Sequence, residues 1–413
     1  MTDIMFPAYQ KYYSALSSLE RFDKEADFFD NISALDSFFS EYRNITFVLQ
    51  KSIAHTEYMP VYEKNREKYL SSCRWLVEKR NETTKEHPFQ LVKQIDILVF
   101  FPSDATHVLT RTFAVENDVE LSDLLDDLKR FFARLNPIQV FFSSKFSFYD
   151  KTTKEDVYEK IVEGIHSMSC FLEAMYQEIG ERSKSTDAII KKISGLKFLH
   201  IPRDMFLIND YAYYPKVNRF ERAGRYAMMP KSDKSLDHIR MPLSNIDRYQ
   251  LSLKMGPVRL DHFKKFVMMN VEIGSTDLMP TFMIVFNDDT FEFDSFQATL
   301  KTTMYRKVNE VAARIAKEDI VAVYYMATYT TFPMDPKYLQ MTSEDRLGYG
   351  VEDVLTFMEV TDTLSERECY FERSKIQNER YIFDQLFNHT SSLNLGKTNM
   401  MPIVEAFRSK GSE

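Results

Sequence analysis

The amino-acid sequence predicts an α+β protein in which an N-terminal helical bundle with a small β insertion precedes a mixed α+β domain. Three observations lead to this expectation. The chain has 413 residues, and single hydrophobic cores usually stop growing at roughly 250–300 residues, so we expect two domains. Apolar residues recur with the helical period through most of the first half. Short apolar runs of strand length interrupt that pattern once and then dominate the second half.

Composition and charge narrow the class of protein. Hydrophobic residues make up 44% and charged residues 28% of the chain, an ordinary globular balance. The net charge is −8 and no Lys/Arg stripe is visible, which argues against tight nonspecific binding to a nucleic-acid duplex. No apolar run approaches the ~18–20 residues that a membrane helix needs. The three cysteines lie far apart and fit a reducing compartment, so we expect a cytoplasmic protein: Cys73, Cys170 and Cys369.

Two long helices are expected near the N-terminus. Apolar residues repeat at alternating three- and four-residue steps from Phe28 to Ile53, which predicts one amphipathic helix. The same spacing predicts a second long helix from Glu57 to Lys79, with Pro60 in the first turn, where proline is tolerated. A shorter amphipathic helix from Pro7 to Leu19 precedes both.

The period changes at Leu91, and a small β insertion is expected over about residues 91–150. Ile95–Phe101 and Gln139–Phe142 read as short strands, the second extended by Ser144–Tyr149. Between them a helix is predicted over Leu121–Leu135, which Asn136-Pro137 ends. We expect the two strands to pair with each other, because a lone strand leaves its backbone groups without partners.

A further long helix is predicted from Val157 to Ile179, followed by Gly180. The polar run Glu181–Asp187 comes directly afterwards and marks the expected junction, which could lie anywhere up to about Pro202. The predicted domains are therefore residues 1–190 and residues 191–413.

The second domain has more strand signals. Phe282–Phe286 and Phe291–Phe293 flank a polar turn and predict a hairpin. Thr302–Ala316 has the helical period, while Ile320–Tyr325 and Leu355–Thr361 have the composition of buried strands.

One group of polar residues suggests a catalytic role. Arg80 is followed directly by Asn81, and His87 lies six residues further on, at the expected end of the second long helix. An Arg-Asn pair, Arg43 and Asn44, also lies in the preceding helix. Both features resemble the HEPN superfamily, whose helical bundles carry an Arg-polar-…-His motif, although the spacing here is at the long end for that family. The resemblance covers roughly residues 20–190.

The residue types fit metal-independent RNA cleavage. Such cleavage needs a base for the ribose 2′-hydroxyl, an acid for the leaving oxygen and positive charge on the phosphate. Histidine as a residue type suits proton transfer near neutral pH, which makes His87 the candidate acid or base. The planar guanidinium of Arg80 matches phosphate oxygens. Asn81 can orient the phosphate or the histidine. The resemblance further implies a homodimer in which two motifs face one cleft, with neither metal nor cofactor.

Structural roles are the alternative for each of these residues. Arg80 could neutralise the carboxyl end of its helix, Asn81 could terminate the helix, and His87 could be a loop residue before Pro88. Arg43 and Asn44 could form a buried supporting network instead of taking part in catalysis, because buried charge must be paired.

The sequence departs from one group of HEPN proteins. In HEPN toxins that a nucleotidyltransferase silences, a tyrosine follows two positions after the motif histidine and becomes modified. Phe89 occupies that position here, so control by AMP transfer is not expected.

Two clusters of residues in the second domain are weaker candidates for a functional site. An acidic group beside the predicted hairpin could bind a divalent ion or form a solvated turn, and comprises Asp288, Asp289, Glu292 and Asp294. A basic-aromatic stretch could contact RNA or a nucleotide, or be an ordinary loop or interface, and comprises Tyr211, Tyr213, Tyr214, Arg219, Arg222, Arg225 and Tyr226.

The resemblance therefore implies a metal-independent HEPN-type endoribonuclease, of the kind that arrests growth or defends prokaryotes against phage. Its partners would be RNA, single-stranded or tRNA-like, and a second copy of the chain. The C-terminal domain would sense a protein or small-molecule regulator or select the substrate, and no membrane is involved. The alternative is a non-catalytic HEPN module that binds nucleotide, RNA or a protein partner.

Overall fold

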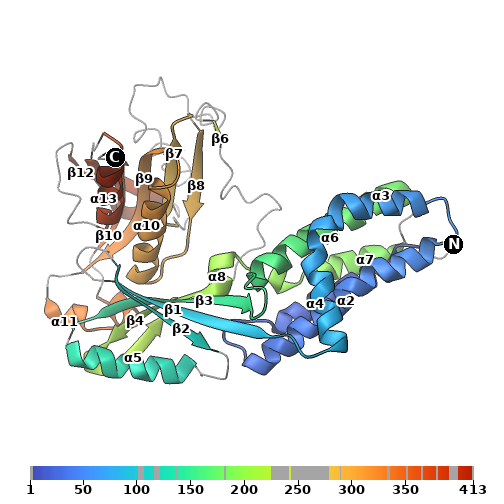
Figure 1. Cartoon of the computed structure of the whole chain (residues 1–413). Coiled ribbons are helices and arrows are strands. Elements are labelled where there is room, and N and C mark those ends of the chain that lie inside the picture. The colour runs from blue at the N-terminus through green and yellow to red at the C-terminus, as the bar shows by residue number, and fades with distance from the viewer. Residues whose placement is uncertain are drawn as a thin grey trace. The chain divides into compact units, whose positions relative to one another are not determined.

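The computed structural model is an α+β fold in which N-terminal helices are followed by two antiparallel sheets with interspersed helices (Figure 1). The described residues are 3–100, 107–115, 121–135, 137–180, 183–224, 241–242, 279–288, 290–332, 335–349, 352–363, 366–377, 380–389 and 399–411.

The N-terminal helices follow the predicted apolar pattern with one exception. The long helix predicted from Phe28 to Ile53 is confirmed as α2, and Asp27 caps it by accepting hydrogen bonds from two backbone N–H groups. The single helix predicted over Glu57–Lys79 is wrong, because a 3-10 turn over Ser71–Cys73 divides it. Serine hydroxyls compete for backbone hydrogen bonds and so favour such interruptions. The observed helices are α1 Phe6–Ser18, α2 Phe28–Ile53, α3 Met59–Leu70 and α4 Arg74–Lys85.

The helix predicted from Val157 to Ile179 is confirmed as α6. Asp156 caps its amino end by accepting from the N–H of Glu159, and Gly180 ends it with φ 72°, a left-handed conformation that glycine adopts without strain. Two shorter helices follow, α7 Lys184–Ile193 and α8 Arg203–Leu207.

The five-stranded sheet contains more than the predicted insertion. The two predicted strands of the insertion are neighbours in it, as β1 and β3, so their predicted pairing is confirmed. The sheet has the order β2-β1-β3-β4-β5, and its two last strands come from beyond residue 190. The helix predicted within the insertion is also confirmed, and the bounds are β1 Leu91–Phe100, β2 His107–Val115, α5 Leu121–Leu135, β3 Val140–Asp150, β4 Ile208–Tyr214 and β5 Arg219–Arg222.

The seven-stranded sheet has the order β12-β11-β10-β9-β7-β8-β6. The predicted hairpin is confirmed: β7 and β8 pair antiparallel, with Val285 opposite Phe291. The elements are β6 Met241–Pro242, β7 Thr281–Phe286, β8 Thr290–Ser295, α10 Lys301–Ile315, β9 Ile320–Thr331, α11 Pro336–Leu339, α12 Ser343–Leu347, β10 Glu352–Thr361, β11 Glu366–Gln377, β12 Arg380–His389 and α13 Met401–Lys410.

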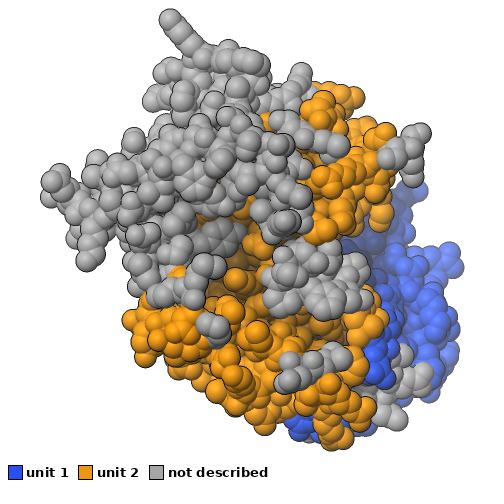
Figure 2. All heavy atoms as spheres, turned by 90° about the vertical axis from the view of Figure 1, so that its left-hand side faces the viewer, with its two compact units in different colours: residues 1–96, 111–127, 144–208 blue, residues 97–110, 128–143, 209–413 orange. Residues whose placement is uncertain are grey.

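The chain divides into two compact units, coloured separately in Figure 2. Unit 1 comprises residues 1–96, 111–127 and 144–208, and unit 2 comprises residues 97–110, 128–143 and 209–413. In the described part of the chain, none of the helices is both long and apolar enough to cross a membrane.

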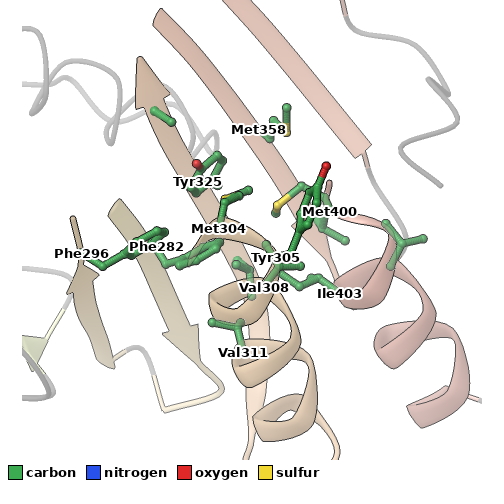
Figure 3. Packing of buried hydrophobic residues seen from close by; sticks show 14 of the residues in the cluster. Phe282, Phe296, Met304, Tyr305, Val308, Val311, Tyr325, Met358, Met400 and Ile403 are labelled. Carbon is green, nitrogen blue, oxygen red and sulfur yellow. The ribbon is translucent and has the colours of Figure 1, made fainter. Parts of the chain in front are cut away.

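Unit 2 has a large apolar core built on α10. One face of this helix packs with residues of the strands and of α13 (Figure 3). Aromatic rings contribute much of the contact, as in the Phe282–Tyr325 pair, whose ring centroids lie 4.8 Å apart. The labelled members of this core are Phe282, Phe296, Met304, Tyr305, Val308, Val311, Tyr325, Met358, Met400 and Ile403.

Candidate functional site

The candidate site lies on α4 and the turn that follows it. Arg80 and Asn81 are inside the helix, which continues to Lys85, and His87 is the second residue after its end. The prediction that Arg80 and Asn81 lie where the helix ends is therefore wrong, and so is the alternative in which Asn81 terminates it. Arg80 also precedes the last turn, where a cation interacts best with the helix dipole.

The guanidinium of Arg80 is held beside Asn81. Its Nη1 donates to the Oδ1 of Asn81 at 3.3 Å. Its Nε is buried and has no hydrogen-bond partner, which is uncommon for a buried polar atom. Arg80 as a whole is half-buried and Asn81 is exposed. This pair therefore presents charged and amide donors at the surface of α4.

The ring of His87 is oriented by the backbone. Its Nδ1 lies 3.0 Å from the carbonyl oxygen of Pro88. A carbonyl oxygen can accept but not donate, so this contact favours the tautomer with the proton on Nδ1. In that tautomer Nε2 carries the lone pair and can take a proton from a substrate.

The structure does not join Arg80 to His87 directly. In the part of the chain that the structure describes, no hydrogen bond or ion pair links them. The backbone N–H of His87 donates to the carbonyl of Glu82 at 3.3 Å, so the turn folds back toward α4. The two residues belong to one local segment, but each has its own partner.

Arg43 and Asn44 lie in α2 and are half-buried. The Nη1 of Arg43 donates to the Oγ1 of Thr46 at 2.7 Å, one turn along the same helix. Arg43 therefore holds a local hydrogen bond with a neutral hydroxyl. No contact with the Arg80 segment is seen among the described residues.

Lys79 is the residue that the sequence analysis missed. It is 1% exposed, and its Nζ lies 2.7 Å from a carboxylate oxygen of Asp150, also 1% exposed, and 2.7 Å from one of Glu82. A signal was present: Lys79 lies three and four residues after Leu76 and Trp75, on the buried face of α4. A lysine on such a face needs a carboxylate partner.

Asp150 is the centre of this buried network. It accepts from the hydroxyl of Thr153 at 2.7 Å and from the N–H of Thr152 at 2.9 Å, besides its pair with Lys79. Burial alone raises the pKa of the Asp150 carboxyl, but these hydrogen bonds outweigh burial and hold the pKa below its usual value. Burial likewise opposes the charge on Lys79, and the two carboxylates raise its pKa nonetheless. The ion pair fixes α4, and with it Arg80, to the end of β3.

Aromatic packing anchors the chain directly after His87. Phe89 is 3% exposed, and its ring centroid lies 5.1 Å from that of Phe39. Trp75 packs edge-on against Phe39 at 5.6 Å. The backbone N–H of Phe89 donates to the carboxylate of Asp36 at 3.1 Å. Phe89 is therefore a core residue that anchors the chain just after His87.

Glu292 and Asp294 of the acidic group are buried in ion pairs, whereas Asp288 lies in an exposed turn. Glu292 and Asp294 are 4% and 9% exposed. Glu292 forms an ion pair with Arg314, and Asp294 lies 3.4 Å from the Nζ of Lys307. Asp288 accepts from Thr290 within the turn, and Asp289 lies outside the described residues. Among the residues searched, no three metal-binding side chains come together.

The three described tyrosines of the basic-aromatic stretch are core residues. Tyr211 is buried and stacks on Phe142 at 5.1 Å, and Tyr213 is buried against Phe220 at 4.7 Å. Tyr214 is also buried, and its hydroxyl donates to Glu221 at 2.8 Å. The described tyrosine rings are thus not exposed for stacking on bases. Arg219 and Arg222 lie on β5, whereas Arg225 and Tyr226 lie outside the described residues.

Comparison with protein-family models, with curated proteins and with solved structures gives no match. A function for this chain is therefore inferred from its own residues.

Proposed function

We propose that the chain is a metal-independent endoribonuclease of HEPN type, with Arg80, Asn81 and His87 as its catalytic residues. The observation that supports this best is the Arg80–Asn81 pair, which presents guanidinium and amide groups on a helix whose position a buried ion pair fixes. The His87 contact with Pro88 adds a ring whose Nε2 is suited to proton transfer.

The proposed reaction is a transesterification. The Nε2 of His87 takes the proton of the ribose 2′-hydroxyl, whose oxygen attacks the adjacent phosphorus while the bond to the 5′-oxygen breaks. A protonated histidine gives a proton to that leaving oxygen. Arg80 binds the non-bridging phosphate oxygens, where negative charge is concentrated, and Asn81 orients the phosphate. The products are a 2′,3′-cyclic phosphate and a 5′-hydroxyl end.

The second histidine comes from a second copy of the chain. One Arg80 and one His87 give little charge for a dianionic transition state, and one histidine cannot be base and acid at once. A two-fold homodimer places each motif opposite its copy. Arg43 and Asn44 are assigned a supporting role in α2.

Substitution of the motif tests this function. His87→Ala is expected to lower the rate of RNA cleavage at least ~10²-fold, the usual scale for removing a positioned acid or base, and Arg80→Ala to lower it comparably. His166→Ala, which removes an exposed histidine from α6, is the matched control and should retain the wild-type rate. Cleavage that survives His87→Ala contradicts the assignment.

A non-catalytic HEPN module is the second candidate function. It is favoured by the lack of a direct contact between Arg80 and His87 and by the net charge of −8. Induced expression separates the two candidates. A nuclease that arrests growth is toxic to its host cell, and Arg80→Ala relieves that toxicity. A module that binds nucleotide, RNA or a protein leaves growth unaffected.

A further inference from the structure

The amino end of α10 and the start of α12, both in unit 2, are attached to the hairpin of β4 and β5. The hydroxyl of Thr302 donates to the carbonyl of Tyr211 on β4 at 2.7 Å. The hydroxyl oxygen of Thr299, which directly precedes the N-cap residue of α10, accepts from the N–H of Gly224 just beyond β5 at 2.9 Å. The N–H of Ser343, at the start of α12, donates to Glu221 on β5 at 2.8 Å. The first turn of α10 and the short helix α12 are therefore held on the same hairpin.

The amino end of α10 lacks the side chains that usually cap a helix or balance its partial positive charge. The N-cap residue is Leu300, which has no side-chain acceptor, and the first turn contains no acidic residue. The first N–H groups of a helix have no intrahelical acceptor and carry partial positive charge. A 15-residue helix such as α10 therefore has an uncompensated positive end.

A buried hydroxyl lies in the first turn of the same helix. Thr303 is 4% exposed, and its Oγ1 is buried without a hydrogen-bond partner. Side chains of a helix tilt toward its amino end, so this hydroxyl leans toward the uncapped turn. A buried hydroxyl without a partner costs stability, which calls for an explanation in terms of something it can bind.

Two cations lie at this end without carboxylate partners. Lys301 is the first residue of α10 and remains exposed to solvent. Arg346, on α12, stacks 5.3 Å from the ring of Phe332 and donates from Nη2 to the carbonyl of Met341, while its Nε is buried without a partner. In the described residues neither cation enters an ion pair.

The two cations also repel each other. Although the Lys301 side chain is accessible, surrounding protein atoms displace much of the water from its ammonium group. This partial burial, and then the positive charge of Arg346, lower the pKa of Lys301. The nearby carboxylate of Glu221 already accepts from Tyr214 and Ser343. Like charges held together in this way cost stability unless an anion lies between them.

We propose that the amino end of α10 binds an oxyanion of the phosphate class. The backbone N–H groups of the first turn, the hydroxyl of Thr303, the ammonium of Lys301 and the guanidinium of Arg346 are its donors. A helix terminus supplies aligned N–H groups for such an anion, and the two cations add charge-assisted hydrogen bonds. This site does not depend on the proposed ribonuclease activity.

Calorimetric titration of the full chain with inorganic phosphate and with AMP tests the site. Saturable binding is expected, and Lys301→Gln and Arg346→Gln should each weaken it about tenfold. Thr303→Val should weaken it while preserving the shape of the side chain. Lys317→Gln removes the same charge from an exposed residue just after the other end of α10 and should leave binding unchanged. Tighter binding of AMP than of phosphate identifies a nucleotide as the source of the phosphate group, and equal binding identifies the phosphate group alone.

Thermal unfolding without anion provides a second readout. Removing one of two repelling charges should leave the Tm of Lys301→Gln equal to or above that of the wild type, whereas a structural lysine would lower it. Phosphate should raise the Tm of the wild type but not that of this variant. No saturable binding of either compound up to about 10 mM, unchanged affinity in Lys301→Gln, or a lowered Tm of ligand-free Lys301→Gln overturns the proposal.

Discussion

Lys79 and Asp150 show how a single pair of charges determines the position of the candidate site. Both side chains are 1% exposed, and their charged atoms lie 2.7 Å apart. Removing charges from water costs several kcal/mol for each ion, and the attraction between them offsets this cost only in good geometry. Here Glu82, Thr153 and the N–H of Thr152 complete the hydrogen bonding. The next residue along the helix is Arg80, so the pair also sets where the guanidinium lies.

Lys79→Ala is expected to destabilise the fold by about 3–5 kcal/mol, because it leaves the Asp150 carboxylate buried without its counter-charge. Lys85→Ala, which removes an exposed lysine from the end of the same helix, should change the free energy of unfolding by less than about 0.5 kcal/mol. Urea unfolding measures both. Equal effects of the two substitutions would mean that the Lys79–Asp150 pair contributes little.

The pair also predicts how stability depends on pH. The folded-state pKa of Asp150 is lowered, so its stabilisation is present above the unfolded pKa of ~3.9 and is lost as the pH falls through the folded value. The pKa of Lys79 is raised, so its stabilisation is present below ~10.4 and is lost as the pH rises beyond that value. We expect the free energy of unfolding to fall less steeply below about pH 4 in the Lys79→Met/Asp150→Leu double variant than in the wild type. Urea unfolding at a series of pH values measures it. The same pH dependence of the free energy of unfolding below about pH 4 in both proteins would show that Asp150 does not cause this loss of stability.

At the scale of elements, prediction from sequence succeeded where local periodicity decides the structure. The bounds of α2, α5 and α6 agree with their apolar patterns. The break between α3 and α4 was missed because the apolar period continues across Ser71–Cys73 while the backbone turns there. The strand β4 was missed as a member of this sheet because its neighbour β3 lies far away in the sequence, and β5, which pairs with β4, was missed with it.

Site residues, too, could be predicted only where the partners lie close together in the sequence. Arg80, Asn81 and His87 could be proposed as a motif because they are close in the sequence. Lys79 was missed because its partner Asp150 is 71 positions away, so nothing local reveals their pairing. The pairing of Glu292 and Asp294 with cations of α10 was missed for the same reason.

The crossing of α4 and α6 depends on Gly164. A Cβ at this position would lie 2.2 Å from the Cδ1 of Leu76, which is 2% exposed, and 3.5 Å from the hydroxyl of Tyr42. That hydroxyl donates to the carbonyl of Gly164 at 2.9 Å. The side chain of Leu76, on the helix that carries Arg80, can therefore occupy this position against α6 only because residue 164 has no side chain.

Gly164→Ala is expected to destabilise the fold by about 1–3 kcal/mol through overpacking, which exceeds the ~1 kcal/mol that alanine gains over glycine inside a helix. The double variant Gly164→Ala/Leu76→Ala should be less destabilised than the sum of the two single variants, because the new methyl group occupies part of the vacated space. Urea unfolding of the three variants provides the comparison. Strict additivity would show that the two side chains do not compete for space.

For the molecule as a whole, we propose that the ribonuclease works as a homodimer formed through the N-terminal helices. The net charge of −8 per chain makes association mildly repulsive at long range, so apolar contacts must supply the affinity and salt should not weaken it. Light scattering is expected to give the mass of a dimer at both low and high salt. A monomer with full cleavage activity contradicts this expectation.

Mixed dimers test whether the two copies share one site. A dimer of one intact chain and one Arg80→Ala/His87→Ala chain is expected to lose nearly all activity, because base and acid come from different chains. Two independent sites would instead leave half of the wild-type rate.

If His87 and Arg80 cleave RNA without a metal ion, as we propose, the fragments carry characteristic ends. Purified protein is incubated with RNA in EDTA, and the ends of the fragments are determined by sequencing with end-specific ligation. We expect 2′,3′-cyclic phosphate and 5′-hydroxyl ends, absent from reactions with His87→Ala, as the result of the proposed metal-independent cleavage. Cleavage that EDTA abolishes, fragments that carry 5′-phosphates, or no cleavage by the dimeric wild type would contradict it.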